Sequence, residues 1–220
     1  MNLRGRLGKN IVALSILQFM NYVVPIVTVP YLTRVLGPER FGLLAFAQAV
    51  IVYFDLITDY GFNLSATRTI AMHRDDQEVL SRVFWSTVAA KVTLMLACGA
   101  TLALLLQVVP ILRKDASLYE AAFLTVIGSA LFPVWLFQGV EQMKFVTLSH
   151  SVARLLSIPA LLLLVKQSGD YVLAAVVQGA VPIVAAIIIA PAVWKRIGIQ
   201  PYLPSVSEAL ALLREGRHLF

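Results

Sequence analysis

Long uninterrupted runs of apolar residues, separated by short polar stretches, make up most of the chain. A helix that crosses a bilayer needs about 20 mostly apolar residues. Because the runs do not alternate between apolar and polar residues with a period of two, they predict helices rather than barrel strands. Six runs qualify as transmembrane helices, and they cover residues 10–35, 41–64, 83–109, 118–138, 147–166 and 171–194. The pattern predicts an all-α, polytopic membrane helix bundle over residues 1–196.

The end of the chain, residues 197–220, differs from these runs. Ser205 and Glu208 have the spacing of a capping box, and the apolar positions of residues 206–213 recur at helical spacing. This pattern predicts an amphipathic cytoplasmic helix on the inner membrane surface, or a plain cytoplasmic linker helix.

The composition supports a membrane protein. Of 220 residues, 59% are hydrophobic and only 14% are charged, whereas ordinary globular proteins contain roughly 25% charged residues. A soluble domain of this composition would expose large apolar patches, and disordered chains are poor in apolar residues. The single cysteine excludes a disulfide-stabilised scaffold. The net charge of +6 does not predict nucleic-acid binding, because the basic residues form no stripe or reader motif.

The distribution of basic residues predicts the orientation of the bundle. With the N-terminus inside, 11 of the 18 Lys and Arg residues lie in cytoplasmic segments, 5 in outer loops and 2 within spans. Cytoplasmic loops carry the excess of Lys and Arg in membrane proteins. Both ends of the six-helix lobe are therefore expected in the cytoplasm.

Four charged residues fall inside predicted spans, namely Asp55, Asp59, Lys91 and Arg154. A charge at the centre of a transmembrane helix costs about 2.5–3.5 kcal/mol on insertion scales, so such residues face a bundle interior or a water-filled cavity. Two interpretations remain open. The carboxylates could neutralise the cations and join helices, or the four residues could serve a substrate or a coupling ion.

Other polar residues recur at helical spacing in the predicted spans. Asp55 and Asp59 are four residues apart and Gln48 precedes Asp55 by seven, so the three share one helix face. The other stripes that share a face are Gln18, Asn21, Pro25 and Thr28 in the first span and His150, Arg154 and Ser157 in the fifth. Polar stripes on several helices predict a central hydrophilic cavity.

No motif points to an enzyme. The three histidines have no metal-ligand spacing, and the chain has neither a P-loop nor a G-x-S-x-G sequence. No cofactor or metal is therefore predicted. A membrane-embedded glycosyl- or acyltransferase is the enzymatic alternative, and no suitable catalytic pair beside a large loop supports it.

Two stretches resemble a known family. The sequence PYLTRVLGPERFGLLAFAQAVIVYFDLITDYGFNLSATRTIA, Pro30–Ala71, and the sequence WLFQGVEQMKF, Trp135–Phe145, resemble polysaccharide flippases of the Wzx type. These belong to the multidrug/oligosaccharidyl-lipid/polysaccharide exporter superfamily. The resemblance implies translocation of undecaprenyl-pyrophosphate-linked oligosaccharide repeat units across the bacterial inner membrane. The products would supply O-antigen, exopolysaccharide or capsule synthesis.

The resemblance also implies roles for the polar residues. Lys91 and Arg154 would bind the pyrophosphate, and Asp55 or Asp59 would bind a proton or a sodium ion, or act in gating. The residues expected to hydrogen-bond the sugar are Gln18, Asn21, Gln48 and Ser157.

Flippases of this kind consist of two pseudo-symmetric lobes, and the chain resembles the N-terminal one. We expect residues 197–220 to lead to a missing second lobe, or two copies of the chain to assemble. Membrane lipids are expected partners, with polysaccharide polymerase and glycosyltransferases as further candidates. The alternatives are a drug/cation antiporter of the same superfamily, which Lys91 and Arg154 disfavour, and a membrane scaffold of a polysaccharide assembly complex that transports nothing.

Overall fold

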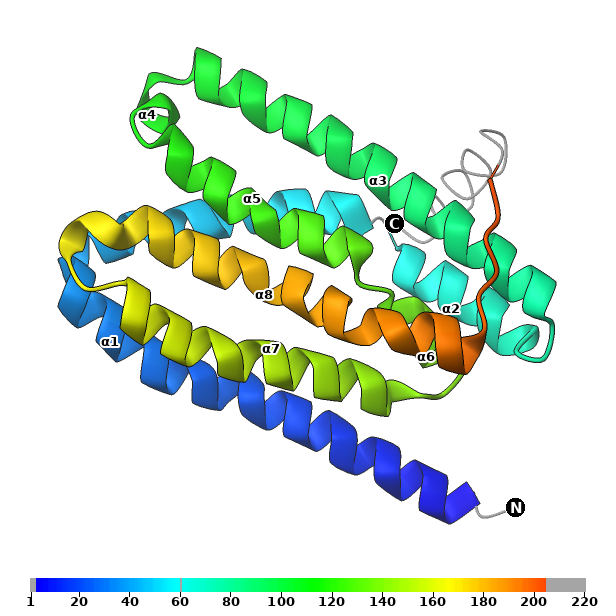
Figure 1. The fold of residues 1–220 in the computed structure, drawn as a ribbon. Helices are drawn as coiled ribbons and strands as arrows, with labels where there is room; N and C mark the ends of the chain where they lie inside the picture. Colours follow the sequence, from blue (N-terminus) through cyan, green and yellow to red (C-terminus); the bar gives the residue numbers. More distant parts are fainter. Residues whose placement is uncertain (1–2, 60, 205–220) are drawn as a thin grey trace.

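The computed structural model describes residues 3–59 and 61–204, with side chains described at Ser15 and from Val23 onward. The described chain is helical and contains no strand, which confirms the predicted all-α membrane bundle (Figure 1). Its helices are α1 (Leu3–Asp59), α2 (Phe62–Met72), α3 (Gln77–Val108), α4 (Pro110–Arg113), α5 (Ala116–Leu131), α6 (Val134–Gly139), α7 (Met143–Leu164) and α8 (Tyr171–Ala192). A 3-10 turn, η1 (Ser168–Asp170), precedes α8, and a π-helical turn, η2 (Val193–Ile197), follows it.

Helix α1 consists of two arms that meet at Gly37. This glycine has φ 78° and ψ 165°, outside the helical region, and such positive φ values are readily adopted only by glycine. Figure 1 shows that the chain reverses direction there, so the second arm, residues 38–59, runs back across the bundle. The bend lies between the first two predicted spans, 10–35 and 41–64.

Five helical stretches of the described chain are long and apolar enough to cross a membrane. They are Val23–Met72, Gln77–Val108, Ala116–Gly139, Met143–Leu164 and Ser168–Ile197. The first stretch contains the bend at Gly37, and it therefore includes parts of two predicted spans, 10–35 and 41–64. The number of six crossings and the cytoplasmic location of both ends stay predictions.

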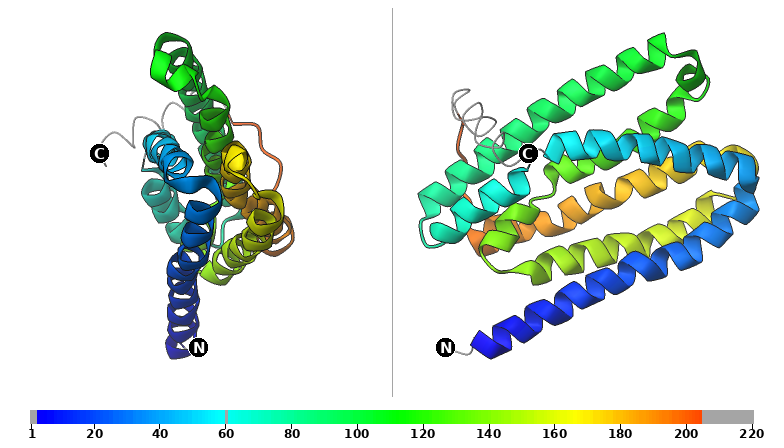
Figure 2. Two further views of the ribbon diagram at one scale, coloured as in Figure 1. Left: turned by 90° about the vertical axis from the view of Figure 1, so that its left-hand side faces the viewer. Right: turned by 180° about the vertical axis from the view of Figure 1, so that it is seen from behind.

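The connections gather at two ends of the bundle. Figure 1 shows the turn after α2, the α6–α7 connection and η2 at one end, called here the α2 end, together with the start of α1. The bend at Gly37, α4 and η1 lie at the opposite end, called the α4 end. The connections thus alternate between the two ends along the chain, and Figure 2 shows them from behind.

Two predicted spans are interrupted, which corrects the sequence interpretation. The predicted span 41–64 does not continue as one helix, because α1 ends at Asp59 and Gly61, with φ 71°, caps the start of α2. The predicted span 118–138 is divided at Phe132 and Pro133, between α5 and α6. Proline has no N–H to donate and disfavours helix in the residue before it. Both breaks lie inside stretches that are apolar overall, so mean hydropathy does not reveal them.

Helix α3 starts at Gln77, six residues before the third predicted span, 83–109. The Asp76 side chain accepts hydrogen bonds from the N–H groups of Glu78 and Val79 and caps the helix. Capping of this kind satisfies N–H groups that have no partner within the helix. The polar stretch before residue 83 thus consists of a short turn, residues 73–76, and the first residues of α3.

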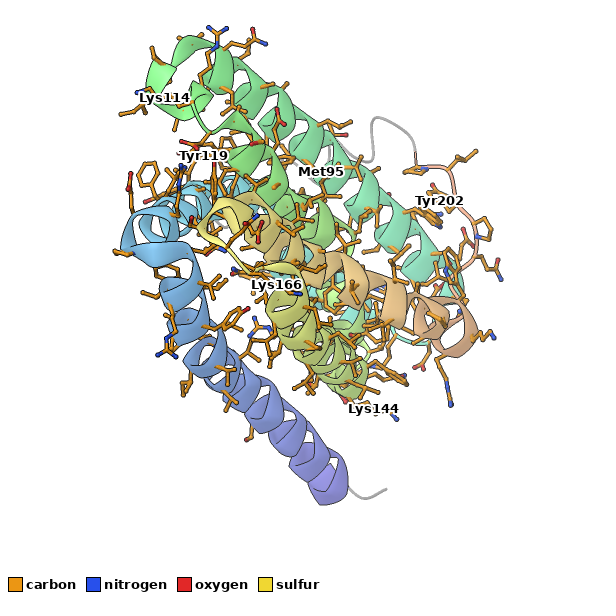
Figure 3. The ribbon with its side chains drawn as sticks, turned by 60° about the vertical axis from the view of Figure 1, so that its left-hand side comes forward. Met95, Lys114, Tyr119, Lys144, Lys166 and Tyr202 are labelled. Atoms are coloured by element: carbon orange, nitrogen blue, oxygen red, sulfur yellow. The ribbon has the colours of Figure 1, made fainter. Side chains whose placement is uncertain are left out.

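The chain after η2 lies along the start of α3. Trp85 Nε1 donates to the Gln200 carbonyl at 2.9 Å, and the Gln200 N–H donates to Ser81 Oγ at 2.9 Å. The Arg82 guanidinium lies 5.9 Å from the centre of the Tyr202 ring, and Figure 3 labels Tyr202 on this segment. The predicted amphipathic helix begins at Ser205, in residues 205–220, which lie outside the described residues.

Helices α5 and α8 cross in close contact. A Cβ atom on Gly128 would lie 2.5 Å from the backbone nitrogen of Ile183 and 2.8 Å from Pro182. One on Gly179 would lie 2.9 Å from the carbonyl oxygen of Ala121. Small residues let transmembrane helices approach closely, and van der Waals packing drives their association.

We expect Gly128→Ala to destabilise the bundle by about 1–3 kcal/mol, the usual cost of overpacking, because the new methyl group meets backbone atoms that cannot move aside. The measurement is the thermal midpoint of unfolding of the purified protein in detergent. Gly42→Ala is the matched control, since no atom lies within 4 Å of its added Cβ. An unchanged midpoint for Gly128→Ala would contradict the proposed tightness of this crossing.

Candidate functional site

Polar residues form a layer between two apolar clusters of the bundle. The cluster near the α4 end includes Phe54, Cys98, Val126, Leu161 and Val177. The cluster near the α2 end includes Ala66, Phe84, Phe132, Ala153 and Ala185. On each of the five helical segments that contribute, the polar residues fall in sequence between a member of one cluster and a member of the other. These residues are Asp55 and Asp59, Lys91, Ser129, Arg154 and Ser157, and Gln178.

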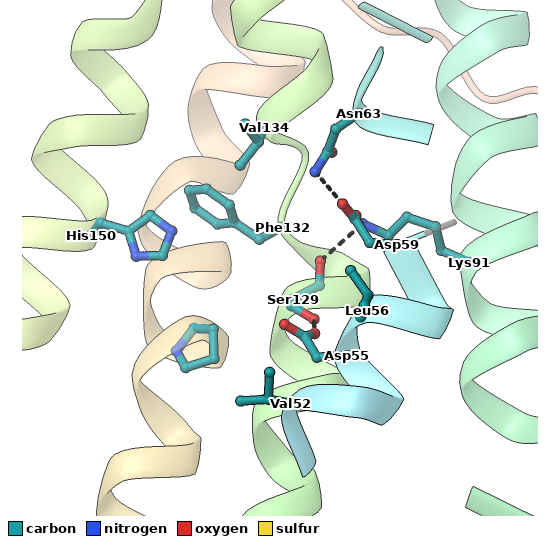
Figure 4. Close-up of a pocket in the computed structure, with 11 residues that line it drawn as sticks. Val52, Asp55, Leu56, Asp59, Asn63, Lys91, Ser129, Phe132, Val134 and His150 are labelled. Atoms are coloured by element: carbon teal, nitrogen blue, oxygen red, sulfur yellow. Dashed lines mark hydrogen bonds and ion pairs between the residues drawn. The ribbon is translucent and has the colours of Figure 1, made fainter. Parts of the chain in front are cut away.

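Two adjoining cavities occupy this layer. The smaller has a volume of about 270 Å³ and the larger about 420 Å³. They share four lining residues, Asp55, Ser129, His150 and Pro182, so we describe them as one cleft between α1, α5, α7 and α8. Figure 4 shows the smaller cavity, with His150 facing Asp55 and Ser129 across it.

Lys91 is buried at one side of the smaller cavity, with only 2% of the residue exposed. Its Nζ donates to Asp59 Oδ1 at 2.7 Å and to the Ser129 carbonyl at 3.4 Å. The same nitrogen lies 4.8 Å from the centre of the Trp135 ring, close enough for a cation–π interaction. The ammonium group is therefore compensated by a carboxylate, a carbonyl and an aromatic face.

The two aspartates have different partners. Asp59 accepts a hydrogen bond from Asn63 at 2.5 Å in addition to the one from Lys91. Asp55 accepts a hydrogen bond from the Ser129 hydroxyl, a neutral donor, and lines both cavities. The charge of Asp59 is thus neutralised by direct contact, whereas Asp55 faces the cleft.

Helix α7 lines the larger cavity with Arg154, Ser157 and His150. The Ser157 hydroxyl donates to the Arg154 carbonyl at 2.7 Å, so this serine bonds to its own helix. The His150 ring packs edge-on against Phe132, with 4.3 Å between the ring centres. A guanidinium and an imidazole thus lie on one face of the cleft.

Gln48 joins α1 to α8 at the edge of the layer. Its side-chain nitrogen donates to Gln178 Oε1 at 2.8 Å, and Gln178 lines the larger cavity. The other two predicted sugar-binding residues are Gln18 and Asn21, whose side chains lie outside the described residues.

The predicted charged residues therefore come together. Asp55, Asp59 and Lys91 line the smaller cavity, and Asp55 lines the larger one as well, together with Arg154 and Ser157. The site residues that sequence reasoning missed are Ser129 and Gln178. Each is a single polar residue inside an apolar run, whereas His150 lies four residues from Arg154 on the polar face predicted for the fifth span. Within the described chain, no three His, Cys, Asp or Glu side chains group as metal ligands.

Membrane-spanning helices around a polar, charged layer are typical of transporters, in which charged residues within the membrane mark substrate or ion pathways. Residues 7–220 match the family described as polysaccharide biosynthesis protein. The chain belongs to this family, whose members include the Wzx-type flippases that the sequence resembles.

Three relatives illustrate the match. A putative O-antigen transporter of Escherichia coli (strain K12) is 34% identical over 214 residues, which are 97% of this chain and 52% of the relative. One of Shigella dysenteriae is 36% identical over 173 residues, or 77% of this chain and 42% of the relative. The succinoglycan biosynthesis transport protein ExoT of Rhizobium meliloti (strain 1021) is 36% identical over 50% of this chain and 20% of its own length.

The chain thus spans about half the length of the first two relatives. No solved structure matches it. The family match and the apolar helices make this chain a multi-pass membrane protein of the polysaccharide biosynthesis family.

We expect Asp59→Asn to lower the stability of the purified protein by about 3 kcal/mol, because removing one partner of a buried ion pair leaves the other charge uncompensated. This is the low end of the usual range, because the Asp59 side chain is 36% exposed and Lys91 retains its hydrogen bond to the Ser129 carbonyl. Thermal unfolding in detergent measures the effect. Glu120→Gln, which neutralises an exposed carboxylate, serves as control, and equal midpoints for the two variants would contradict the importance of the pair.

Proposed function

We propose that this chain is one lobe of a flippase that moves undecaprenyl-pyrophosphate-linked oligosaccharide across the bacterial inner membrane. The cleft of the polar layer is the path of the polar headgroup. The observation that carries the proposal is the placement of Arg154 in a cavity of about 420 Å³ inside a membrane bundle. The relatives' names support transport of polysaccharide precursors in preference to drugs or cations.

Arg154 is the residue we assign to the pyrophosphate. A guanidinium presents several N–H donors in a plane and binds phosphate oxygens in a bidentate manner. Thr28 and Ser157 line the same cavity, and their hydroxyls would have to turn from the carbonyls of their own helices to donate to the phosphate. Gln48 with its partner Gln178 offers amides to the sugar. Gln18 and Asn21, on the first arm of α1, are further candidates for sugar contacts.

Lys91 contributes to headgroup binding in a different way. Its ammonium already contacts Asp59 and Ser129, so it binds phosphate only when the pair with Asp59 opens. Arg154 therefore makes the first contact, and the opening of the Lys91–Asp59 pair is the gating step.

Asp55 is the better placed of the two aspartates to bind a coupling proton or sodium ion. It lines both cavities, and its described hydrogen-bond partner, Ser129, carries no charge. Asp59, in contrast, is neutralised by Lys91. The two aspartates thus divide coupling and gating between them.

The transport pathway requires a second wall. Because the chain spans about half the length of the relatives, a second lobe or a second copy of the chain completes the cleft. The basic α2 end faces the cytoplasm, as the positive-inside rule predicts, so the substrate enters where it is synthesised. Polysaccharide polymerase and glycosyltransferases are the proposed neighbours of the assembled transporter.

We expect Arg154→Ala to reduce export of surface polysaccharide by at least tenfold while the protein stays in the membrane at its normal level. A charge-assisted hydrogen bond contributes roughly 1.5–3 kcal/mol, and 1.4 kcal/mol corresponds to tenfold in affinity. Export by the full-length transporter in cells that lack their own copy is measured by labelling surface polysaccharide. Arg113→Ala, an exposed cation at the α4 end, is the control, and normal export by Arg154→Ala would refute the assignment.

We expect Asp55→Asn to abolish the dependence of transport on a proton or sodium gradient. A neutral amide has no negative charge with which to bind a proton or a sodium ion. Transport into vesicles with and without each gradient measures this effect. Glu120→Gln should keep the dependence of the unmodified protein. If Asp55→Asn responds to the gradient as before, Asp55 is not the coupling site.

A further inference from the structure

Two helix breaks lie at the same level of the bundle. Helix α1 ends at Asp59, and Gly61 with φ 71° caps the start of α2. Helix α5 ends at Leu131, and Pro133 caps the start of α6. Figure 2 shows α2 turning off the line of α1. Broken helices within a membrane are tolerated where protein groups satisfy the freed carbonyls.

Lys91 contacts both breaks at once. Its Nζ bonds to Asp59, the last residue of α1, and to the carbonyl of Ser129, in the last turn of α5. The C-terminal end of a helix carries partial negative charge from its unpaired carbonyls, which a cation stabilises. One ammonium group from the continuous helix α3 thus holds the ends of two interrupted helices.

Beyond the breaks, α2 and α6 pack against each other. A Cβ on Gly139 would lie 2.5 Å from Cγ2 of Ile70, so the helices touch closely. The Thr67 hydroxyl donates to the Trp135 carbonyl at 3.3 Å. Past the helix ends, Arg74 forms an ion pair at 3.3 Å with Glu141. These contacts make α2 and α6 one body, called here the α2–α6 unit. Helix α2 of this unit also packs against α3.

The α2–α6 unit forms one wall of the smaller cavity. Asn63 from α2 and Val134 from α6 both line it, and Asn63 also bonds to Asp59. Figure 4 shows Asn63 and Val134 on the same side of the cavity. A displacement of the unit would change access to Asp59 and Lys91 from the α2 end.

Lys91 reaches the unit through the Trp135 ring of α6, whose centre lies 4.8 Å from its Nζ. It also reaches the unit through Asp59, which accepts a hydrogen bond from Asn63 of α2. We propose that the α2–α6 unit moves as one body about the paired helix breaks, with Lys91 as the residue that holds it closed against α1 and α5. Movement of the unit opens the cleft toward the α2 end. Lys91 is thus a positioning residue. The role of this movement in admitting substrate rests on the proposed function, but the movement itself does not.

The test measures distances between spin labels in the full-length protein in lipid nanodiscs, with Cys98→Ala to remove the native thiol. Labels are placed on cysteines introduced at Met72, Gln138 and Ile187, exposed positions on α2, α6 and α8. In Lys91→Met we expect the distance distributions from position 187 to both 72 and 138 to broaden together. The distribution between 72 and 138 should stay narrow.

Two control variants make the result decisive. Asp59→Asn should broaden the same two distributions, and it replaces Lys91→Met if that variant does not fold. Gly179→Ala overpacks the α5–α8 crossing against Ala121, away from the breaks, and should leave all three distributions unchanged. Unchanged distances from position 187, a broadened 72–138 distribution, or the same broadening in Gly179→Ala would each overturn the proposal.

The outcome is independent of transport, because the labels are read without substrate. Joint broadening with normal polysaccharide export by Arg154→Ala would keep the moving unit and reject the headgroup site. Loss of export in Arg154→Ala without any broadening in Lys91→Met would do the reverse.

Discussion

The burial of one ammonium group, that of Lys91, constrains the rest of the polar layer. A cation in an apolar bundle must be paired and hydrogen-bonded, since its isolated burial is prohibitively costly. Asp59 provides the charge, while the Ser129 carbonyl and the Trp135 ring occupy two further sides. These partners come from three different elements, α1, α5 and α6. Their convergence fixes where α1 and α5 can stop and where α2 and α6 can begin.

The two sides of this layer are built differently. Toward the α4 end the α1 arms, α3, α5, α7 and α8 form one apolar cluster, and glycines bring α5 and α8 into backbone contact at Gly128 and Gly179. Toward the α2 end the short helices α2 and α6 lie beyond breaks. A closely packed half and a segmented half suit a transporter that keeps one side closed while the other rearranges.

Much of the fold and part of the site could be predicted from the sequence. Hydropathy is additive along the chain, so the apolar runs located the membrane helices without knowledge of their neighbours. The cost of intramembrane charge selected Asp55, Asp59, Lys91 and Arg154, and the structure brings them to one cleft. Ser129 and Gln178 were missed because a single polar residue in an apolar span is common. Only its neighbours in space show whether it faces a cavity.

The sequence by itself thus determined the solvent of this protein, a lipid bilayer, and its membership in a polysaccharide-biosynthesis family. Those properties follow from composition, from the length of apolar runs and from local motifs. Tertiary structure alone decided that Lys91 pairs with Asp59, that Asp55 instead faces the cleft, and that two apolar spans are broken at one level. The reason is physical. A buried charge is stabilised by groups that are distant in sequence, and a helix break is stable only where such groups hydrogen-bond to the freed carbonyls.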